Sequence, residues 1–123
     1  MNMNREPAKS FSDLIVWQKG HQLVLKIHKY ADNFPGKEIY CLVPQLRRAV
    51  ISVPANIAEG FKKKGKADKV RFLNIAQGSL EEVRYYLILA ADLGYGRSDE
   101  LISELDVVSK LLECYMASIR KSM

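Results

Sequence analysis

The stretch LRRAVISVPANIAEGFKKKGK, residues 46–66, decides the fold because it places a proline inside an apolar helical pattern and then runs into lysines. Its apolar residues recur with the three- and four-residue steps of one helix face: Leu46, Val50, Val53, Ile57 and Phe61. Pro54 removes one backbone hydrogen bond and presses on the carbonyl of Val50, which costs about 3 kcal/mol. Both halves keep one apolar face, so we predict a helix that begins near Pro44 and is kinked, not ended, at Pro54.

Three other segments show the helical period, and no stretch shows the period of two that is typical of a strand. The first segment follows Phe11 and ends at Pro35. The next ends at Gly94, which suits a left-handed cap, and the last has Ser98 as its expected N-cap. The three main stripes are Val16, Gly20, Leu23, Ile27, Tyr30 and Phe34; then Leu73, Ala76, Leu80, Val83, Leu87 and Ala90; then Leu101, Leu105, Val108, Leu112, Tyr115 and Ile119. We therefore predict an all-α protein, an antiparallel up-down four-helix bundle with its second helix kinked at Pro54.

The length of 123 residues, with 48% hydrophobic content, suits one core. We expect a disordered tail at residues 1–10 and a single bundle domain at 11–123. No apolar run is long enough for a signal peptide or a membrane span, so we expect a cytoplasmic protein. Cys41 and Cys114 match no metal-ligand spacing, and we expect reduced, half-buried thiols.

Some apolar residues fall outside the main stripes of the last two helices. They are Ile88, Ile102, Val107, Leu111 and Met116. The first and third helices also have wider apolar faces than a four-helix core needs. Such surplus is typical of an oligomer interface, so we expect self-association.

Positive charge is concentrated in one segment of the chain. The net charge is +5, whereas residues 46–71 hold eight basic residues against Glu59 and Asp68, a net of +6. The candidate nucleic-acid-binding residues are Arg47, Arg48, Lys62, Lys63, Lys64, Lys66, Lys69 and Arg71. A phosphate-bearing partner and a merely solubilising helix end both fit this charge. Phe61 borders the lysines and would stack on an unpaired base if it were exposed.

Polar residues near Pro54 are candidates for hydrogen bonds that compensate for the proline. Ser52 lies one turn before the kink and is placed to hydrogen-bond to a backbone group that the proline frees. Asn56 and Glu59 lie one turn apart beyond it, and either satisfy freed backbone groups or pair with Arg47 or Arg48.

Chemistry-bearing patterns are scarce. His21 and His28 lie on an otherwise apolar stripe without the Glu-x-x-His spacing of di-iron bundles, so we expect packed histidines and no metal site. Glu81 and Glu82 are adjacent and about 100 degrees apart around a helix, so they do not form an acid and base pair. The tract GFKKKGK lacks the spacing of a phosphate-binding loop. We expect no catalytic residues, no cofactor and no small-molecule substrate, hence no enzyme.

Three blocks resemble a known family: FSDLIVWQKGHQL, FPGKEIYCLVPQLRRAVISVPANIAEG and RFLNIAQGSLEEVRYYLILAADLGY. In order and spacing they resemble the four-helix bundle proteins related to the 23S rRNA intervening-sequence protein, also called the S23 ribosomal protein family. The resemblance covers residues 11 to about 95. It implies a bundle that assembles into a ring-shaped homopentamer. It also implies likeness to the accessory variability protein of diversity-generating retroelements, a basic pentamer that associates with reverse transcriptase and structured RNA.

Two functions remain open. The first is a basic oligomeric bundle that binds structured RNA or a nucleoprotein through phosphate contacts, with five copies multiplying the charge to +25. The second is a structural, self-assembling protein–protein interaction module in which the lysines serve solubility alone.

Overall fold

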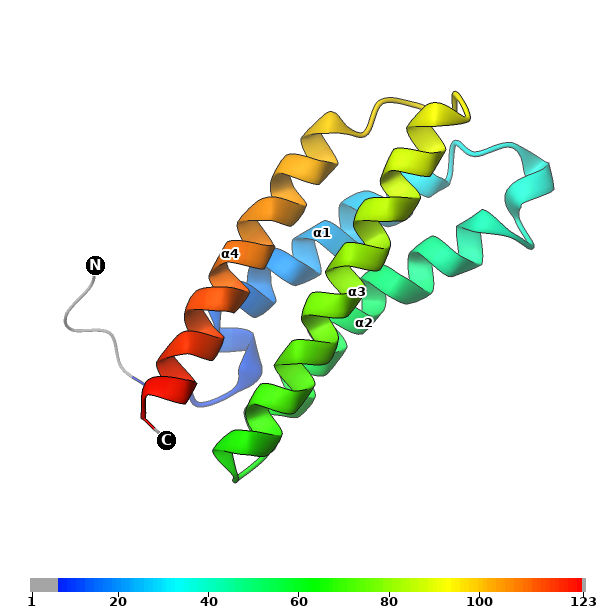
Figure 1. Ribbon diagram of the computed structural model, residues 1–123. Helices are drawn as coiled ribbons and strands as arrows, with labels where there is room; N and C mark the ends of the chain where they lie inside the picture. Colours follow the sequence, from blue (N-terminus) through cyan, green and yellow to red (C-terminus); the bar gives the residue numbers. More distant parts are fainter. Residues whose placement is uncertain (1–6, 123) are drawn as a thin grey trace.

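The computed structural model describes residues 7–122, which form four antiparallel α-helices and contain no strand (Figure 1). The helices are α1 (Ile15–Ala31), α2 (Leu42–Lys62), α3 (Lys66–Asp92) and α4 (Asp99–Lys121), with 3₁₀ turns η1 (Phe11–Asp13) before α1 and η2 (Gly36–Glu38) before α2. Contacts join α1 to α2, α2 to α3, α3 to α4 and α4 back to α1, and the α2–α3 contact is the most extensive. The predicted all-α four-helix bundle is confirmed. Within residues 7–122, no helix has the length and apolar character needed to cross a membrane.

The core lies where the sequence periods place it. Every member of the α3 stripe is buried, and so are Leu46, Val50, Val53 and Ile57 of α2. The α1 and α4 stripes are buried too, apart from Tyr30, Leu101 and Tyr115, which are half-buried against the same core. Met116 is also a core residue, so our assignment of its side chain to surplus surface was wrong. Of the other surplus residues, Ile88 and Val107 are exposed, whereas Ile102 and Leu111 are half-buried.

The helix α2 runs unbroken through Pro54, as predicted. Its proline ring is itself buried, and the fully buried side chains of Val50, Val53 and Ile57 offset the missing backbone bond through packing. The Ser52 hydroxyl bonds to no backbone group within residues 7–122, contrary to our expectation. Its Oγ lies 2.8 Å from Ser79 Oγ of α3. Asn56 instead donates from Nδ2 to the Ser52 carbonyl at 2.8 Å and to Ser52 Oγ at 2.9 Å.

The turn from α3 to α4 contains Gly94, which we predicted to end α3, and Ser98, which we predicted to be the N-cap of α4. Gly94 has φ +83°, and the backbone N–H groups of Gly94 and Tyr95 donate to the carbonyls of Ala91 and Ala90. These two bonds form a Schellman cap, which confirms the predicted left-handed glycine. Ser98 occupies the N-cap position of α4 but makes no side-chain cap. Its Oγ is buried and donates to the Leu87 carbonyl at 2.9 Å, so it joins the turn to α3.

The first helix starts later than its periodicity predicts. Leu14 is extended, with φ −78° and ψ 128°, and separates η1 from α1. Residues 1–6 of the expected tail at residues 1–10 lie outside the described residues. Within the described part, the N–H groups of Lys9 and Ser10 donate to Asp13 Oδ2 at 2.9 and 3.1 Å. These two bonds hold the pKa of the Asp13 carboxyl below its usual 3.8.

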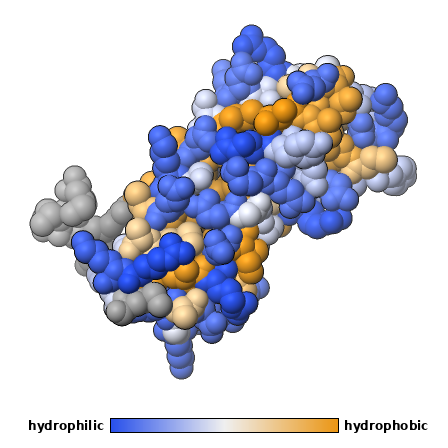
Figure 2. Space-filling model, in the orientation of Figure 1, coloured by the Kyte–Doolittle hydropathy of each residue, from blue (hydrophilic) through white to orange (hydrophobic). Residues whose placement is uncertain are grey.

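The two ends of the bundle differ in chemistry. One end holds the α2–α3 turn and the C-terminal end of α4, whereas the other holds the α1–α2 and α3–α4 connections (Figure 1). Apolar surface gathers near the C-terminal end of α3 (Figure 2), where Leu93 is exposed. Cys41 lies beside Tyr40, and both Cys41 and Cys114 are free and exposed, so the half-buried placement we expected for them was wrong.

Candidate nucleic-acid interface

The candidate interface is built by the shortest connection between long helices. Lys62 ends α2, the extended residues Lys63 and Gly65 flank the turn, and Lys66 begins α3. We name as the basic tip the six cations on this turn and on the first turns of α3: Lys62, Lys63, Lys64, Lys66, Lys69 and Arg71. Residues 60–71 contain these six and one acid, Asp68, a net of +5 that equals the charge of the whole chain. All of the net charge therefore lies at one end of the molecule.

Three of the six cations bond to the fold itself. Lys69 Nζ donates to the carbonyls of Phe61, at 2.6 Å, and Gly60, at 3.4 Å, and so caps the C-terminal end of α2. Lys66 Nζ donates to the Ser122 carbonyl at 2.6 Å. Arg71 lies 3.5 Å from Asp68 Oδ1 in an exposed pair, which contributes little to stability.

The other three are free to contact a partner. Within residues 7–122, no hydrogen bond or ion pair engages the ammonium groups of Lys62, Lys63 or Lys64. Lys62 and Lys64 are exposed, and Lys63 is half-buried with its Nζ 4.9 Å from the centroid of the Phe72 ring. The N-terminal end of α3 lies in the same turn, and its dipole adds to the positive potential there.

The structure separates Arg47 and Arg48 from the basic tip. Lys62 follows Arg48 by 14 residues, which corresponds to about 21 Å along the helix. Arg47 donates to Asp32 Oδ1 at 2.7 Å and to the His28 carbonyl at 3.4 Å, and its buried Nε has no hydrogen-bond partner among residues 7–122. Arg48 contacts Gln45 Oε1 at 3.5 Å. The eight candidates therefore form no single surface, and Arg47 joins α2 to α1 through Asp32 and not through Asn56 or Glu59.

Sequence reasoning missed two cations beside the tip. Arg120 and Lys121 are exposed in the last turn of α4, and the bond from Lys66 to Ser122 brings that turn to the α2–α3 connection. The up-down order contained the necessary signal, since the second and fourth helices of such a bundle end on the same side.

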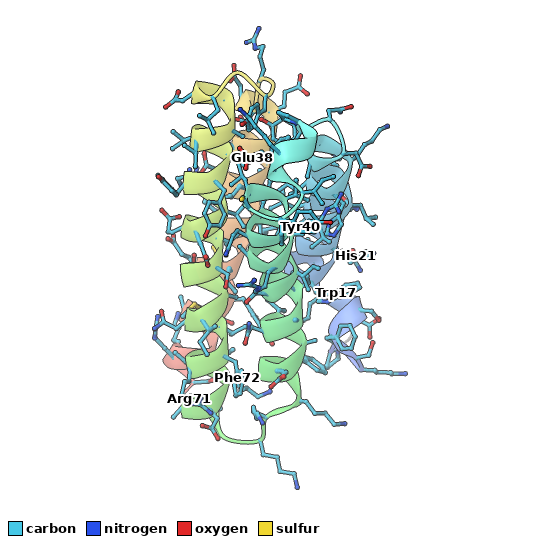
Figure 3. All side chains as sticks on the ribbon, turned by 90° about the vertical axis from the view of Figure 1, so that its right-hand side faces the viewer. Trp17, His21, Glu38, Tyr40, Arg71 and Phe72 are labelled. Carbon is cyan, nitrogen blue, oxygen red and sulfur yellow. The ribbon has the colours of Figure 1, made fainter. Side chains whose placement is uncertain are left out.

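Two aromatic rings lie among these cations. Phe72 has Lys63 Nζ at 4.9 Å and Arg71 Cζ at 4.6 Å from its centroid, whereas Phe61 has Lys69 Nζ at 5.5 Å. Both side chains are half-buried. Figure 3 shows Arg71 and Phe72 side by side near the turn, at the opposite end of the bundle from Glu38 and Tyr40.

The histidines are placed differently from each other. His28 is half-buried, and its Nδ1 lies 2.9 Å from the Val24 carbonyl. His21 is exposed and stacks on Trp17 with the ring centroids 5.1 Å apart and the planes 10° apart, so the packed position we expected for it was wrong. Within residues 7–122, no group of three or more metal-ligating side chains comes together.

The adjacent glutamates have separate partners. Glu81 pairs with Arg84 at 3.3 Å, and Glu82 accepts a hydrogen bond from Tyr86 Oη at 2.9 Å. The bond to Glu82 raises the pKa of Tyr86. These contacts are surface pairs along α3.

Comparison with known proteins bears on family and fold. The model of the family described as "23S rRNA-intervening sequence protein" matches residues 12–114. A crystal structure of a protein with unknown function from the S23 ribosomal protein family of Bacteroides thetaiotaomicron superposes with a TM-score of 0.71 at 24% sequence identity, over 83% of this chain and 98% of that one. No curated protein sequence matches the chain.

Proposed function

The chain belongs to the 23S rRNA-intervening sequence protein family, and we propose that it is a non-enzymatic, self-associating bundle that binds RNA or a nucleoprotein through phosphate groups. The observation that carries the proposal is the basic tip. All of the net charge of +5 lies within residues 60–71, and the ammonium groups of Lys62, Lys63 and Lys64 are engaged by no acid of the described chain.

The chemistry of the tip favours phosphate contacts over recognition of base sequence. Lysine presents a mobile point charge on a flexible stem, which suits a phosphate approached from many directions. Three adjacent lysines at the turn between α2 and α3 offer charge without the fixed donor geometry that reading a base edge requires. Binding of this kind is electrostatic and depends strongly on salt concentration.

Self-association is supported by apolar side chains that no other part of the described chain covers. Exposed examples on three helices are Ile51, Ile75, Tyr85, Ile88 and Val107. The family resemblance suggests a ring of five copies, which would carry a charge of +25. Several tips on one particle would bind a long RNA more tightly than one tip, because each further contact is intramolecular.

The alternative is a self-assembling protein–protein module with no role for nucleic acid. It is favoured by an apolar groove of about 300 Å³ between η1, α1 and α2. The residues that line it include Phe11, Trp17 and His21, and Ala55 and Ala58 of α2. A groove of this composition suits an apolar side chain of another protein.

Two measurements test the proposal together. Affinity for a structured RNA, measured at several salt concentrations, should be high at low salt and fall linearly as the logarithm of salt rises. Sedimentation should give a mass that is a multiple of the 14.0 kDa chain. An oligomer that binds no RNA even at low salt would favour the alternative, and a monomer would contradict self-association in either form.

A further inference from the structure

We propose that Phe72, together with Lys63 and Arg71, forms a binding site for one unpaired nucleotide. The base stacks on the Phe72 ring, and the two cations contact the phosphates on either side of it. This inference rests on the proposed RNA binding and adds what kind of RNA the tip prefers: a loop, bulge or single strand in place of a continuous duplex.

The geometry points to this ring because two cations from different elements converge on it. Lys63 comes from the turn, and Arg71 comes from the second turn of α3. Their charged groups lie 4.9 and 4.6 Å from the ring centroid. Both distances are within the range at which a cation is attracted to an aromatic face. Proteins that bind unpaired strands combine such a basic surface with aromatic rings on which bases stack.

The ring is held firmly at its base. Gly60 of α2 is buried and faces Phe72, and a Cβ built on Gly60 would lie 3.2 Å from Phe72 Cβ. The two helices therefore approach so closely that the Phe72 backbone and Cβ have little freedom. Because the side chain is only half-buried, part of its surface stays accessible to a base. A fixed platform loses little conformational entropy when a base binds.

A base can displace the cations that lie over the Phe72 ring. Arg71 is exposed and has only a 3.5 Å contact with Asp68, and Lys63 has no ionic partner within residues 7–122. An exposed contact between a cation and a ring is weaker than the stacking of a base on that ring. A base can therefore displace both cations from the ring face, and each cation can then contact one of the two phosphates that flank the base.

Phe61 is the matched aromatic residue that the structure disfavours. Lys69 Nζ lies 5.5 Å from its ring and bonds to its carbonyl at 2.6 Å. Moving Lys69 away from that ring would break the cap of α2, so the cation there is not free to follow a phosphate. Phe61, which sequence alone suggested for stacking, is therefore the control.

The experiment compares two RNAs with equal numbers of phosphates, a hairpin with an unpaired pyrimidine loop and a fully paired duplex. Wild-type protein should prefer the hairpin. The variant Phe72→Leu, which keeps Cβ and an apolar side chain against Gly60, should weaken hairpin binding about 5- to 100-fold. It should leave duplex binding and the salt dependence unchanged, because no phosphate contact is lost. Phe61→Leu should bind both RNAs as wild type does.

Ultraviolet crosslinking of the wild-type protein to the hairpin, read by mass spectrometry, gives a measurement that needs no variant. Crosslinks from the loop nucleotides should fall on the peptide that contains Phe72. Wild type that binds no RNA at low salt would overturn the proposed function itself. RNA binding that depends on the tip lysines, with equal affinity for Phe72→Leu and wild type or with loop crosslinks confined elsewhere, would overturn only this inference.

Discussion

Lys69 Nζ donates a hydrogen bond of 2.6 Å to the carbonyl of Phe61 and thereby joins the first turn of α3 to the last turn of α2. The bond satisfies a carbonyl that has no partner within its own helix. It also divides the lysines of the basic tip by role, since Lys69 holds the turn together while Lys62, Lys63 and Lys64 remain free of acids in the described chain. The number of lysines in this segment of the sequence is therefore larger than the number available to a partner.

Replacing Lys69 by methionine should lower the free energy of unfolding by about 1 kcal/mol, because the change removes a charge-assisted bond to a half-buried carbonyl and keeps the apolar stem. Urea denaturation measures the effect as a lower midpoint with an unchanged slope. Lys64→Met is the control, since Lys64 is exposed and should leave the midpoint where it is. Equal midpoints for the two variants would show that the cap does not stabilise the turn.

Gly60 and Gly78 should respond oppositely to alanine. A Cβ at Gly60 would lie 3.2 Å from the Lys69 carbonyl oxygen and 3.2 Å from Phe72 Cβ, whereas a Cβ at Gly78 meets nothing within 4 Å. Gly60→Ala should destabilise the protein by about 1–2 kcal/mol through overpacking. Gly78→Ala should stabilise it by about 0.5–1 kcal/mol through helix propensity. Thermal unfolding distinguishes these signs, and stabilisation by both changes would mean that the helices can separate at Gly60.

The hydroxyl groups of Ser52 and Ser79 should be energetically coupled. They lie 2.8 Å apart between α2 and α3, and Asn56 Nδ2 donates to Ser52 Oγ at 2.9 Å. Ser79→Ala should cost about 1 kcal/mol because it removes one partner of a part-buried hydrogen bond. The double variant Ser52→Ala and Ser79→Ala should cost less than the sum of the single variants in a denaturation cycle. Strict additivity would contradict the bond.

Glu38 joins three elements, and its bond to Tyr95 should make stability sensitive to high pH. Tyr95 Oη donates to Glu38 Oε2 at 2.5 Å, and Glu38 Oε1 accepts from the Leu42 N–H at 3.3 Å. The bond to Glu38 raises the pKa of Tyr95 above its ordinary value of 10.0. The stabilisation is therefore fully present below pH 10 and is lost as the pH rises through the raised pKa.

The variant Tyr95→Phe tests this sign directly. It should unfold at a lower temperature than wild type at pH 7, and the difference should shrink as the pH rises beyond 10. Tyr85→Phe is the control, because Tyr85 is exposed and makes no side-chain hydrogen bond within residues 7–122. A difference between Tyr95→Phe and wild type that does not vary with pH would exclude the phenol as the titrating group.

Helix positions and core residues were predictable from the sequence because both depend on local periodicity. The steps of three and four residues predicted the buried stripe of each helix. Gly94 predicted a left-handed cap because glycine, unlike residues with a Cβ, adopts positive φ without steric cost. The continuation of α2 through Pro54 was also predictable, because the apolar face continues on both sides of the proline.

Partners across helices were not predictable in the same way. Arg47 pairs with Asp32, Ser52 with Ser79, and Ser98 with the Leu87 carbonyl, each through a neighbour that tertiary packing supplies. Tertiary packing also determines which residues meet at the candidate site. Phe72 is half-buried, but its position under two cations depends on how closely α2 approaches α3 at Gly60.

The most direct test compares the salt dependence of RNA binding for two triple variants with equal loss of charge. One variant changes Lys62, Lys63 and Lys64 to glutamine. The other changes Lys19, Lys29 and Lys110, which are exposed on α1 and α4 away from the tip. If the tip binds phosphates, the slope of log affinity against log salt flattens by about 2 in the first variant and stays near that of wild type in the second. Equal flattening in both variants, or in neither, would contradict binding at the tip.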